Sequence, residues 1–244
     1  AGTGVATFFG FGGWRDVYPM PDEEVRRWEE VNLASELACA DTNALLVNDA
    51  TAACIAECEL GGKTAEDSLL YVYIGAFVGG GVVLNRQVFF GSNGNAGALA
   101  SMPVGRGQLI NHASLHLLRS ALTAAKCSLK DGSATTQKIM MRWRRDAAKA
   151  LASAIAAAVA VLDLGHVVID GELPHTELDA LANAVQQALT PKQLQGLICP
   201  EVRTGAMGLA ASCLGAAWLP LYVKYSPAQA LLLKQLPLVA VPAQ

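Results

Sequence analysis

The chain has little charge. Only 16% of its 244 residues are Asp, Glu, Lys or Arg, compared with about 25% in a typical soluble protein, and 52% are apolar. This composition excludes intrinsic disorder, because disordered chains combine low hydrophobicity with high charge. The formal net charge of −3 gives no indication that the chain itself binds nucleic acid. The abundance of apolar side chains predicts a homodimer or a larger homo-oligomer.

The chain also lacks the cysteine pattern of a disulfide scaffold. Its six cysteines include no Cys-x-x-Cys pair, and the nearest two, Cys54 and Cys58, are one helical turn apart. We therefore expect reduced, mostly buried cysteines in a cytoplasmic protein. No signal peptide is recognisable, and the longest weakly polar stretch, residues 150–162, is shorter than the ~20 residues that cross a bilayer. No contact with a membrane is expected. Because the first residue is Ala1 rather than methionine, we expect upstream sequence to precede it.

Apolar runs of strand length alternate with runs of helical period, and this alternation predicts an α/β fold with helices on the faces of a sheet. Strands are expected at residues 44–47, 68–75, 81–88, 166–171 and 195–202, and helices at residues 21–30, 32–39, 50–60, 109–122, 138–162, 177–189 and 206–222. Residues 1–20 are expected to form a strand end and a loop. Residues 237–242 are too rich in proline for a helix.

Polar residues at predicted strand ends are candidate site residues, because ligands of α/β folds bind beyond the carboxyl ends of the strands. Asn48-Asp49 follows the first predicted strand and has two interpretations. It caps the next helix, with side-chain oxygens that accept hydrogen bonds from the first turn. Alternatively, Asp49 accepts a proton from a substrate hydroxyl while Asn48 orients the substrate. Asp170-Gly171 ends another predicted strand in the same way.

Two further patterns are weaker. Gly75 and residues 79–81 connect two predicted strands, and they either permit a tight turn or leave backbone amides open to a phosphate or a sugar. No Gly-Lys-Ser/Thr follows, so the segment is not a P-loop. His112 and His116 are one helical turn apart, but no third ligand is evident and we expect no metal site there.

The order of these segments along the chain is more specific than any one of them. Val47-Asn48-Asp49-Ala50-Thr51-Ala52-Ala53 is followed by Tyr73-Ile74-Gly75, by Gly79-Gly80-Gly81, by Gly94-Asn95-Ala96-Gly97-Ala98-Leu99 and, far downstream, by Leu214-Gly215-Ala216-Ala217. This arrangement closely resembles the ROK family of repressors, open reading frames and sugar kinases, and the resemblance covers most of the chain. It implies an actin/hexokinase-like fold, in which two ribonuclease-H-like lobes enclose a cleft, with the first lobe incomplete here.

For a kinase of this family, the resemblance implies that Asp49 is the general base and that Asn48 binds sugar hydroxyls. We expect Asn95 and Gly94 to supply further polar contacts to the sugar. ATP and Mg²⁺ would be needed only in the kinase case. The residues that would then face the nucleotide and its phosphates are Gly75, Gly79, Gly80, Gly81 and Gly171.

Several residues depart from the kinase pattern. Ala98 stands where family kinases have the glutamate that holds the sugar ring, and Ser101 stands where they have a histidine that binds sugar and structural zinc. Cys127 has no neighbouring cysteine at ligand spacing, so we expect no zinc. The Asp-x-Gly-x-Thr loop for phosphate and magnesium is not found, and Gly2-Thr3-Gly4 lacks its acidic residue.

These departures favour the transcriptional-regulator branch of the family. We expect a sugar-sensing effector domain that needs no cofactor and meets DNA only through a winged helix-turn-helix outside this chain. The alternatives are a divergent ATP-dependent sugar kinase, with Asp49 as its base, and a degenerate scaffold that binds nothing. The expected divisions are residues 1–62 as the remainder of the N-terminal lobe, 63–215 as the C-terminal lobe, and 216–244 as a helix and tail that return to the first lobe.

Overall fold

The computed structural model describes residues 21–38, 44–62 and 66–226. Its centre is a five-stranded sheet in the order β3-β2-β1-β6-β7. Strands β1, β6 and β7 run parallel, and β2 and β3 extend the sheet from β1 as an antiparallel meander. The strands are β1 (Leu69–Ile74), β2 (Val78–Leu84), β3 (Gln87–Phe89), β6 (His166–Gly171) and β7 (Glu201–Thr204).

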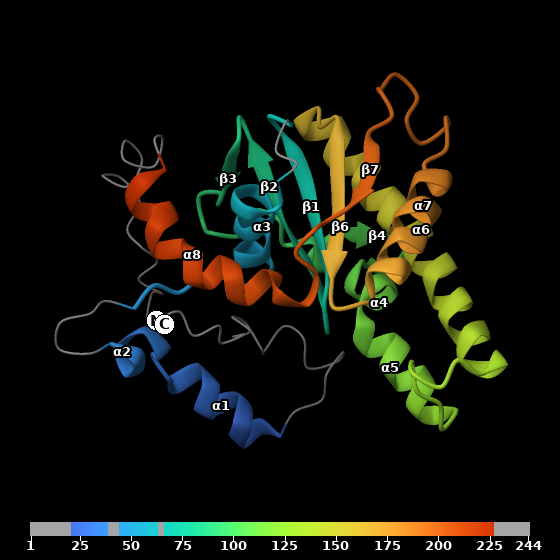
Figure 1. Ribbon diagram of the computed structural model, residues 1–244, viewed down its shortest axis with the longest axis horizontal. Coiled ribbons are helices and arrows are strands. Elements are labelled where there is room, and N and C mark those ends of the chain that lie inside the picture. Colours follow the sequence, from blue (N-terminus) through green and yellow to red (C-terminus); the bar gives the residue numbers. More distant parts are fainter. Residues whose placement is uncertain (1–20, 39–43, 63–65, 227–244) are drawn as a thin grey trace.

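Helices cover both faces of this sheet (Figure 1). One face is packed against α3 and α8, which lie side by side, and the other against α4 to α7. This arrangement confirms the predicted α/β class. The helices are α3 (Asp49–Leu60), α4 (Ile110–Ala113), α5 (Leu115–Ala124), α6 (Ala134–Leu162), α7 (His175–Ala188) and α8 (Ala211–Tyr225).

Strand β1 is buried along its whole length, and its side chains divide between the two helical layers. Leu70, Val72 and Ile74 contribute to the core under α4 to α7, whereas Tyr71 and Tyr73 contribute to the core under α3 and α8. This division follows from the two-residue period of a strand. A strand covered on both faces is expected to be apolar throughout, as this one is.

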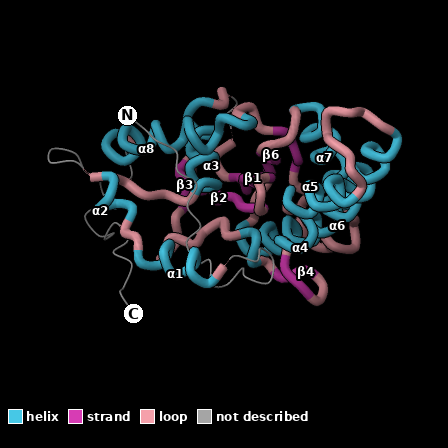
Figure 2. The backbone as a smooth tube through the Cα atoms, turned by 90° about the horizontal axis from the view of Figure 1, so that it is seen from below, coloured by secondary structure: helices cyan, strands magenta, loops and turns pink. Residues whose placement is uncertain are grey.

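The remaining elements are short. A two-stranded ribbon is formed by β4 (Pro103–Val104) and β5 (Gly107–Gln108), and single 3-10 turns are η2 (Leu99–Ser101) and η3 (Gly208–Ala210). Helices α1 (Asp22–Glu30) and α2 (Leu33–Leu37) lie below the sheet in Figure 1 and can be followed from beneath in Figure 2. None of the described helices is both long enough and apolar enough to span a bilayer. The predictions for residues 1–20 and 237–242 lie outside the described residues.

The strand predicted at residues 44–47 is wrong. These residues are described, but they form no strand before α3 begins. A strand requires a partner for its backbone hydrogen bonds, and no described strand pairs with this segment. The apolar run alone therefore could not decide its conformation.

Other elements also differ from the sequence prediction in their boundaries. The single strand predicted at 81–88 is two strands, β2 and β3, joined by a turn at Asn85 and Arg86. Strand β2 begins at Val78, so the three glycines lie inside it and only residues 75–77 form the connection to β1. The strand predicted at 195–202 is wrong for residues 195–200, because β7 begins at Glu201 and continues to Thr204. The single helix predicted at 109–122 is divided at Ser114, whose backbone is extended because its hydroxyl accepts a hydrogen bond from Val78 N–H (3.0 Å).

Helix α3 lies unusually close to its neighbours because glycines face it. A Cβ atom at Gly81 would come within 2.6 Å of Cys54 Sγ, and one at Gly79 within 2.7 Å of Ala50 Cβ. On the other side, a Cβ at Gly215 of α8 would overlap the carbonyl oxygen of Ala52. The glycines thus allow α3 to lie against β2 and α8 with no intervening side chain.

A buried ion-pair network fixes the far end of α3 to β7. Glu57 is only 2% exposed, and its carboxylate accepts hydrogen bonds from Arg203 (3.1 Å) and from the amide of Ala206 (2.8 Å). Arg203 also donates to Glu66 (3.1 Å). A buried charge is tolerated only when it is paired in this way, so the network ties α3 to the opposite half of the sheet.

Replacement of Gly215 tests the close packing of α3 and α8. Alanine favours a helix over glycine by about 1 kcal/mol, but in Gly215→Ala the new methyl group would meet the Ala52 carbonyl. We expect a net loss of about 2–3 kcal/mol in the free energy of unfolding, measured by urea denaturation. Gly165→Ala is the matched control, because a Cβ atom at Gly165 would meet no other atom within 4 Å. Equal stability of the two variants would contradict the packing described here.

Candidate functional site

The carboxyl ends of β1 and β6 meet at one edge of the sheet. Ile74 pairs with Gly171 at the last position of both strands, and the next residue, Glu172, donates its amide hydrogen to Ile74 O (2.9 Å). Helix α3 begins beside this edge, because Ala50 contacts Gly79 on the neighbouring strand β2. Parallel topology and glycine packing therefore bring Asp49 and Glu172 to the same edge.

Asn48 caps helix α3. Its Oδ1 accepts hydrogen bonds from the amides of Ala50 (3.0 Å) and Thr51 (3.3 Å), and its backbone is extended at φ −61° and ψ 142°. The capping interpretation is therefore confirmed. The residue is exposed, and its amide nitrogen makes no hydrogen bond to the described residues. The cap thus leaves the Asn48 side-chain NH₂ group exposed to solvent. Capping is compatible with the prediction that Asn48 binds a sugar, which remains a prediction.

Asp49 occupies the first turn of α3 and is partly buried. Its Oδ1 accepts a hydrogen bond from the Ala50 amide (2.8 Å). Burial raises the pKa of the Asp49 carboxyl above its usual value; the Ala50 hydrogen bond opposes this increase, and the negative charge of Glu172 adds to it. Burial thus destabilises the ionised form of this partly accessible carboxylate. Such a group can accept a proton from a ligand hydroxyl or form a hydrogen bond with it.

Asp170, at the other predicted polar tip, is turned inward instead. Its carboxylate is fully buried and accepts hydrogen bonds from the Tyr71 hydroxyl (3.0 Å) and from the amides of Gly171 (2.8 Å) and Gly208 (3.0 Å). These donors join β1, β6 and the segment before α8. Asp170 is therefore a structural carboxylate and is not presented to a ligand.

The polar groups of the connection between β1 and β2 are used within the fold. The carbonyls of Gly75 and Ala76 accept hydrogen bonds from the first amides of α5, at Leu115 (3.0 Å) and His116 (3.1 Å). Val78 N–H is bonded to the Ser114 hydroxyl. The Val78 amide, next to this connection, is therefore not free to bind a phosphate.

The glycines themselves are explained by packing. A Cβ at Gly80 would collide with Tyr71 O, and one at Gly171 would collide with Ile74 O. Gly79 and Gly81 face α3, as described above. Packing therefore explains each glycine of β2, and phosphate binding is not needed to account for them.

Gly94 and Asn95 lie in the exposed loop after β3. Gly94 has a φ of 71°, a value that glycine adopts without strain, and Asn95 O accepts a hydrogen bond from the Ala98 amide (3.1 Å). Within the described chain, no hydrogen bond links the Asn95 side chain to Asn48 or Asp49. The proposed contribution of this loop to ligand binding remains a prediction.

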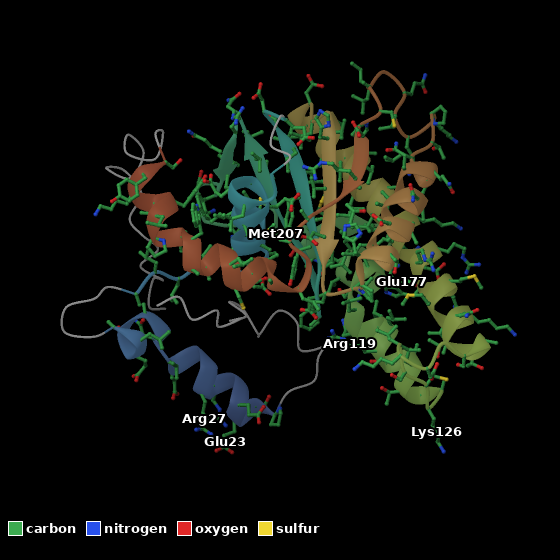
Figure 3. All side chains as sticks on the ribbon, viewed as in Figure 1. Glu23, Arg27, Arg119, Lys126, Glu177 and Met207 are labelled. Atoms are coloured by element: carbon green, nitrogen blue, oxygen red, sulfur yellow. The ribbon has the colours of Figure 1, made fainter. Side chains whose placement is uncertain are left out.

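Glu172 and Arg119 were missed by sequence reasoning. Arg119, which is labelled on α5 in Figure 3, donates from Nη2 to Glu172 Oε2 at 2.7 Å. This pair lies at the sheet edge beside Asp49, and it gives that edge two carboxylates and one guanidinium. The position of Glu172 directly after a predicted polar strand end was the available signal. Its partner on a separate helix could not be anticipated.

No metal centre is found in the described segments, which contain no group of three or more His, Cys, Asp or Glu side chains placed to hold an ion. The His116 ring lies 5.1 Å from the Phe77 ring and its Nδ1 is 3.2 Å from Ala76 O. His116 therefore packs against the β1–β2 connection.

Comparison with known proteins identifies the fold. A sequence profile of the ROK family matches residues 7–222. The chain belongs to the ROK family. It is 28% identical over 189 residues to the protein y4fQ of Sinorhizobium fredii, an alignment that covers 72% of this chain and 46% of that one. The chain thus spans less than half the length of y4fQ.

Two solved structures illustrate the range of the family. The ROK hexokinase of Thermus thermophilus is 29% identical, with a TM-score of 0.57 over 72% of this chain and 67% of that chain. A ROK transcriptional regulator, a homologue of the E. coli MLC protein, is 19% identical, with a TM-score of 0.55 over 72% of this chain and 51% of that chain. The actin/hexokinase-like fold expected from the sequence is therefore confirmed.

The raised pKa of Asp49 has a measurable consequence. The Asp49 carboxyl has a higher pKa in the folded protein than in the unfolded protein. The folded protein therefore becomes less stable as the pH rises from the unfolded-state pKa through the folded-state pKa. Asp49→Asn should therefore raise the melting temperature at pH 7, and the increase should shrink as the pH is lowered towards 4.

Asp131→Asn provides a control of opposite sign. Hydrogen bonds from the Thr136 hydroxyl and from the amides of Ser128 and Ser133 hold the pKa of Asp131 well below its usual range. Its removal should lower the melting temperature at pH 7. A lower melting temperature for Asp49→Asn at pH 7 would contradict the environment described for Asp49.

Proposed function

We propose that this chain is the sugar-sensing effector domain of a ROK-type transcriptional regulator and that it binds a sugar or sugar derivative without transferring phosphate. The ligand would lie at the carboxyl edge of the sheet, beside the first turn of α3. DNA would be contacted by a separate winged helix-turn-helix. The protein would act in the cytoplasm as a homodimer or a larger homo-oligomer.

One observation carries this proposal: the Val78 amide, next to the connection that would face nucleotide phosphates in a kinase, is already bonded within the fold. The amide of Val78 is bonded to Ser114, and the N-terminal amides of α5 are bonded to the carbonyls of Gly75 and Ala76. Phosphoryl transfer depends mainly on positioning and neutralising the phosphates. The nearby carboxylates of Asp49 and Glu172 would repel phosphates that carry no counter-cation.

The same edge suits a sugar hydroxyl. Asp49 offers carboxylate oxygens as acceptors, and the unbonded amide nitrogen of Asn48 offers donors one residue away. Because Asn48 is fixed by its capping bonds, it would be held in place before the ligand arrives. Gly94 and Asn95 are proposed to complete the polar surface from the loop after β3.

Sensing requires two conformations with different affinity for the sugar. A ligand that bridges Asp49 and residues of another lobe would favour the closed arrangement, and closure in each protomer would reposition the DNA-binding domains. The solved ROK regulator supports this proposal only in showing that the same fold occurs in a regulator.

A divergent sugar kinase is the second candidate. The likeness to the Thermus thermophilus hexokinase favours it, and Asp49 would then be the general base that accepts the proton of the sugar hydroxyl. In that case Gly75, residues 79–81 and Gly171 would face the nucleotide, which would require the Ser114–Val78 hydrogen bond to open.

A paired binding and turnover experiment separates these candidates. We expect at least one member of a panel of glucose, N-acetylglucosamine, N-acetylmannosamine and their 6-phosphates to raise the melting temperature, because a ligand at 100 times its Kd stabilises by about 2.7 kcal/mol. Asp49→Asn should remove this increase, and Lys149→Gln, on the exposed side of α6, should not.

The same proteins, incubated with Mg²⁺, ATP and each sugar, should release no ADP above background. Sugar-dependent ADP release that Asp49→Asn abolishes would establish the kinase. No thermal shift with any sugar and no turnover would favour the degenerate scaffold.

A further inference from the structure

A hollow lies at the opposite end of α3 from Asp49. It has a volume of about 530 Å³ and is bounded by the last turn of α3, the β2–β3 turn and the C-terminal half of α8. Ten residues separate Asp49 from Glu59 at its rim, which corresponds to ~15 Å along the helix. We call it the α8 groove, and the lining residues used below are Glu59, Asn85, Arg86, Gln87, Trp218 and Tyr222.

The turn that enters this groove is strained. Strands β2 and β3 are joined by two residues, Asn85 and Arg86, with φ values of 52° and 64°. This is the type I′ geometry, for which Asn-Gly is the favoured sequence because both residues have positive φ. An arginine in this conformation is less stable than a glycine. Arg86 thus places a guanidinium at the groove from a backbone position where glycine would be more stable. Strained positions of this kind are often found at functional sites.

The charged groups of the groove have no partners within the described segments. Neither Arg86 nor Glu59 forms an ion pair or a side-chain hydrogen bond there, and the side-chain amides of Asn85 and Gln87 are also unbonded. The two charges are of opposite sign and are the only charged side chains among the described lining residues. The groove thus offers both donors and acceptors with no net charge.

Aromatic rings form the α8 side of the groove. Tyr222 is buried, and its hydroxyl accepts a hydrogen bond from Val88 N–H (3.0 Å), which holds the ring in place. Trp218 lies one turn earlier on α8 and is partly exposed. Large rigid rings present an apolar surface at little cost in conformational entropy.

This combination selects a ligand class. A strongly anionic ligand would meet Glu59 as well as Arg86, and a purely apolar peptide would leave both charges desolvated and unpaired. A sugar has hydroxyls that both donate and accept, and the C–H face of its ring can lie on an aromatic side chain. A volume near 530 Å³ is within the range of small-molecule sites, about 300–1,000 Å³.

We propose that the α8 groove is a second binding site, specific for a neutral di- or oligosaccharide and separate from the site at Asp49. Arg86 and Glu59 hydrogen-bond to ring hydroxyls, and Trp218 contacts the face of a sugar ring. The proposal does not require the sugar at Asp49 to be the same compound.

Titration calorimetry with maltose, cellobiose and N,N′-diacetylchitobiose tests the groove on the whole chain. We expect at least one disaccharide to bind both the wild type and Asp49→Asn with the same affinity. Arg86→Gly should weaken that binding at least tenfold while the melting temperature stays equal or rises, because glycine relieves the strained turn. Arg142→Ala, an exposed arginine of α6, is the matched control and should bind as the wild type does.

The outcomes separate this site from the one at Asp49. No binding of any disaccharide overturns the groove proposal, as does binding that Arg86→Gly leaves unchanged or that Asp49→Asn abolishes. If a disaccharide binds in an Arg86-dependent manner while no sugar responds to Asp49→Asn, the groove proposal holds and the function proposed for Asp49 fails.

Discussion

The close seating of α3 is the constraint on which the rest of the structure depends. The helix is buried from Ala50 to Glu57, so it cannot rely on a polar outer face, and its neighbours must approach without side chains between them. Gly81 and Gly215 make this possible. The position of α3 then determines where its first turn meets the sheet edge and where its last turn meets α8. If α3 lay at an ordinary packing distance, its first turn would be displaced from the sheet edge and its last turn from α8.

Glycine also explains why the β1–β2 connection is difficult to interpret from sequence. Gly79, Gly80 and Gly81 are compatible with an open phosphate cradle and with a strand that must admit a helix on one face and a loop on the other. Only the neighbours decide between these possibilities, and Ala50, Cys54 and Leu99 lie too close for any other residue. Ser114 and the first turn of α5 also form hydrogen bonds with the Val78 amide and with the carbonyls of Gly75 and Ala76. These contacts join residues far apart in the chain, so no local pattern contains them.

Elements with strong local periodicity could be predicted from the sequence, and those that depend on a partner could not. The strand predicted at residues 166–171 is β6, and α6 contains the whole helix predicted at 138–162. Residues 44–47 have the same apolar character as a strand, yet they lack a partner in the described chain and remain unpaired. In the candidate site, Asn48 and Asp49 were anticipated, whereas the Arg119–Glu172 pair was not, because it joins a helix to a strand end 53 residues away.

The two aspartates near the carboxyl ends of the strands have contrasting environments. Asp170 and Asp49 both lie near the carboxyl edge of the sheet. Asp170 accepts hydrogen bonds from three donors on three segments, and these bonds hold the segments together. Asp49 is partly buried and receives one amide hydrogen bond, with a second carboxylate nearby. Its negative charge is incompletely compensated by the protein. A ligand hydroxyl would supply the missing donor, and that deficit is the physical argument for the proposal that Asp49, rather than Asp170, binds the ligand.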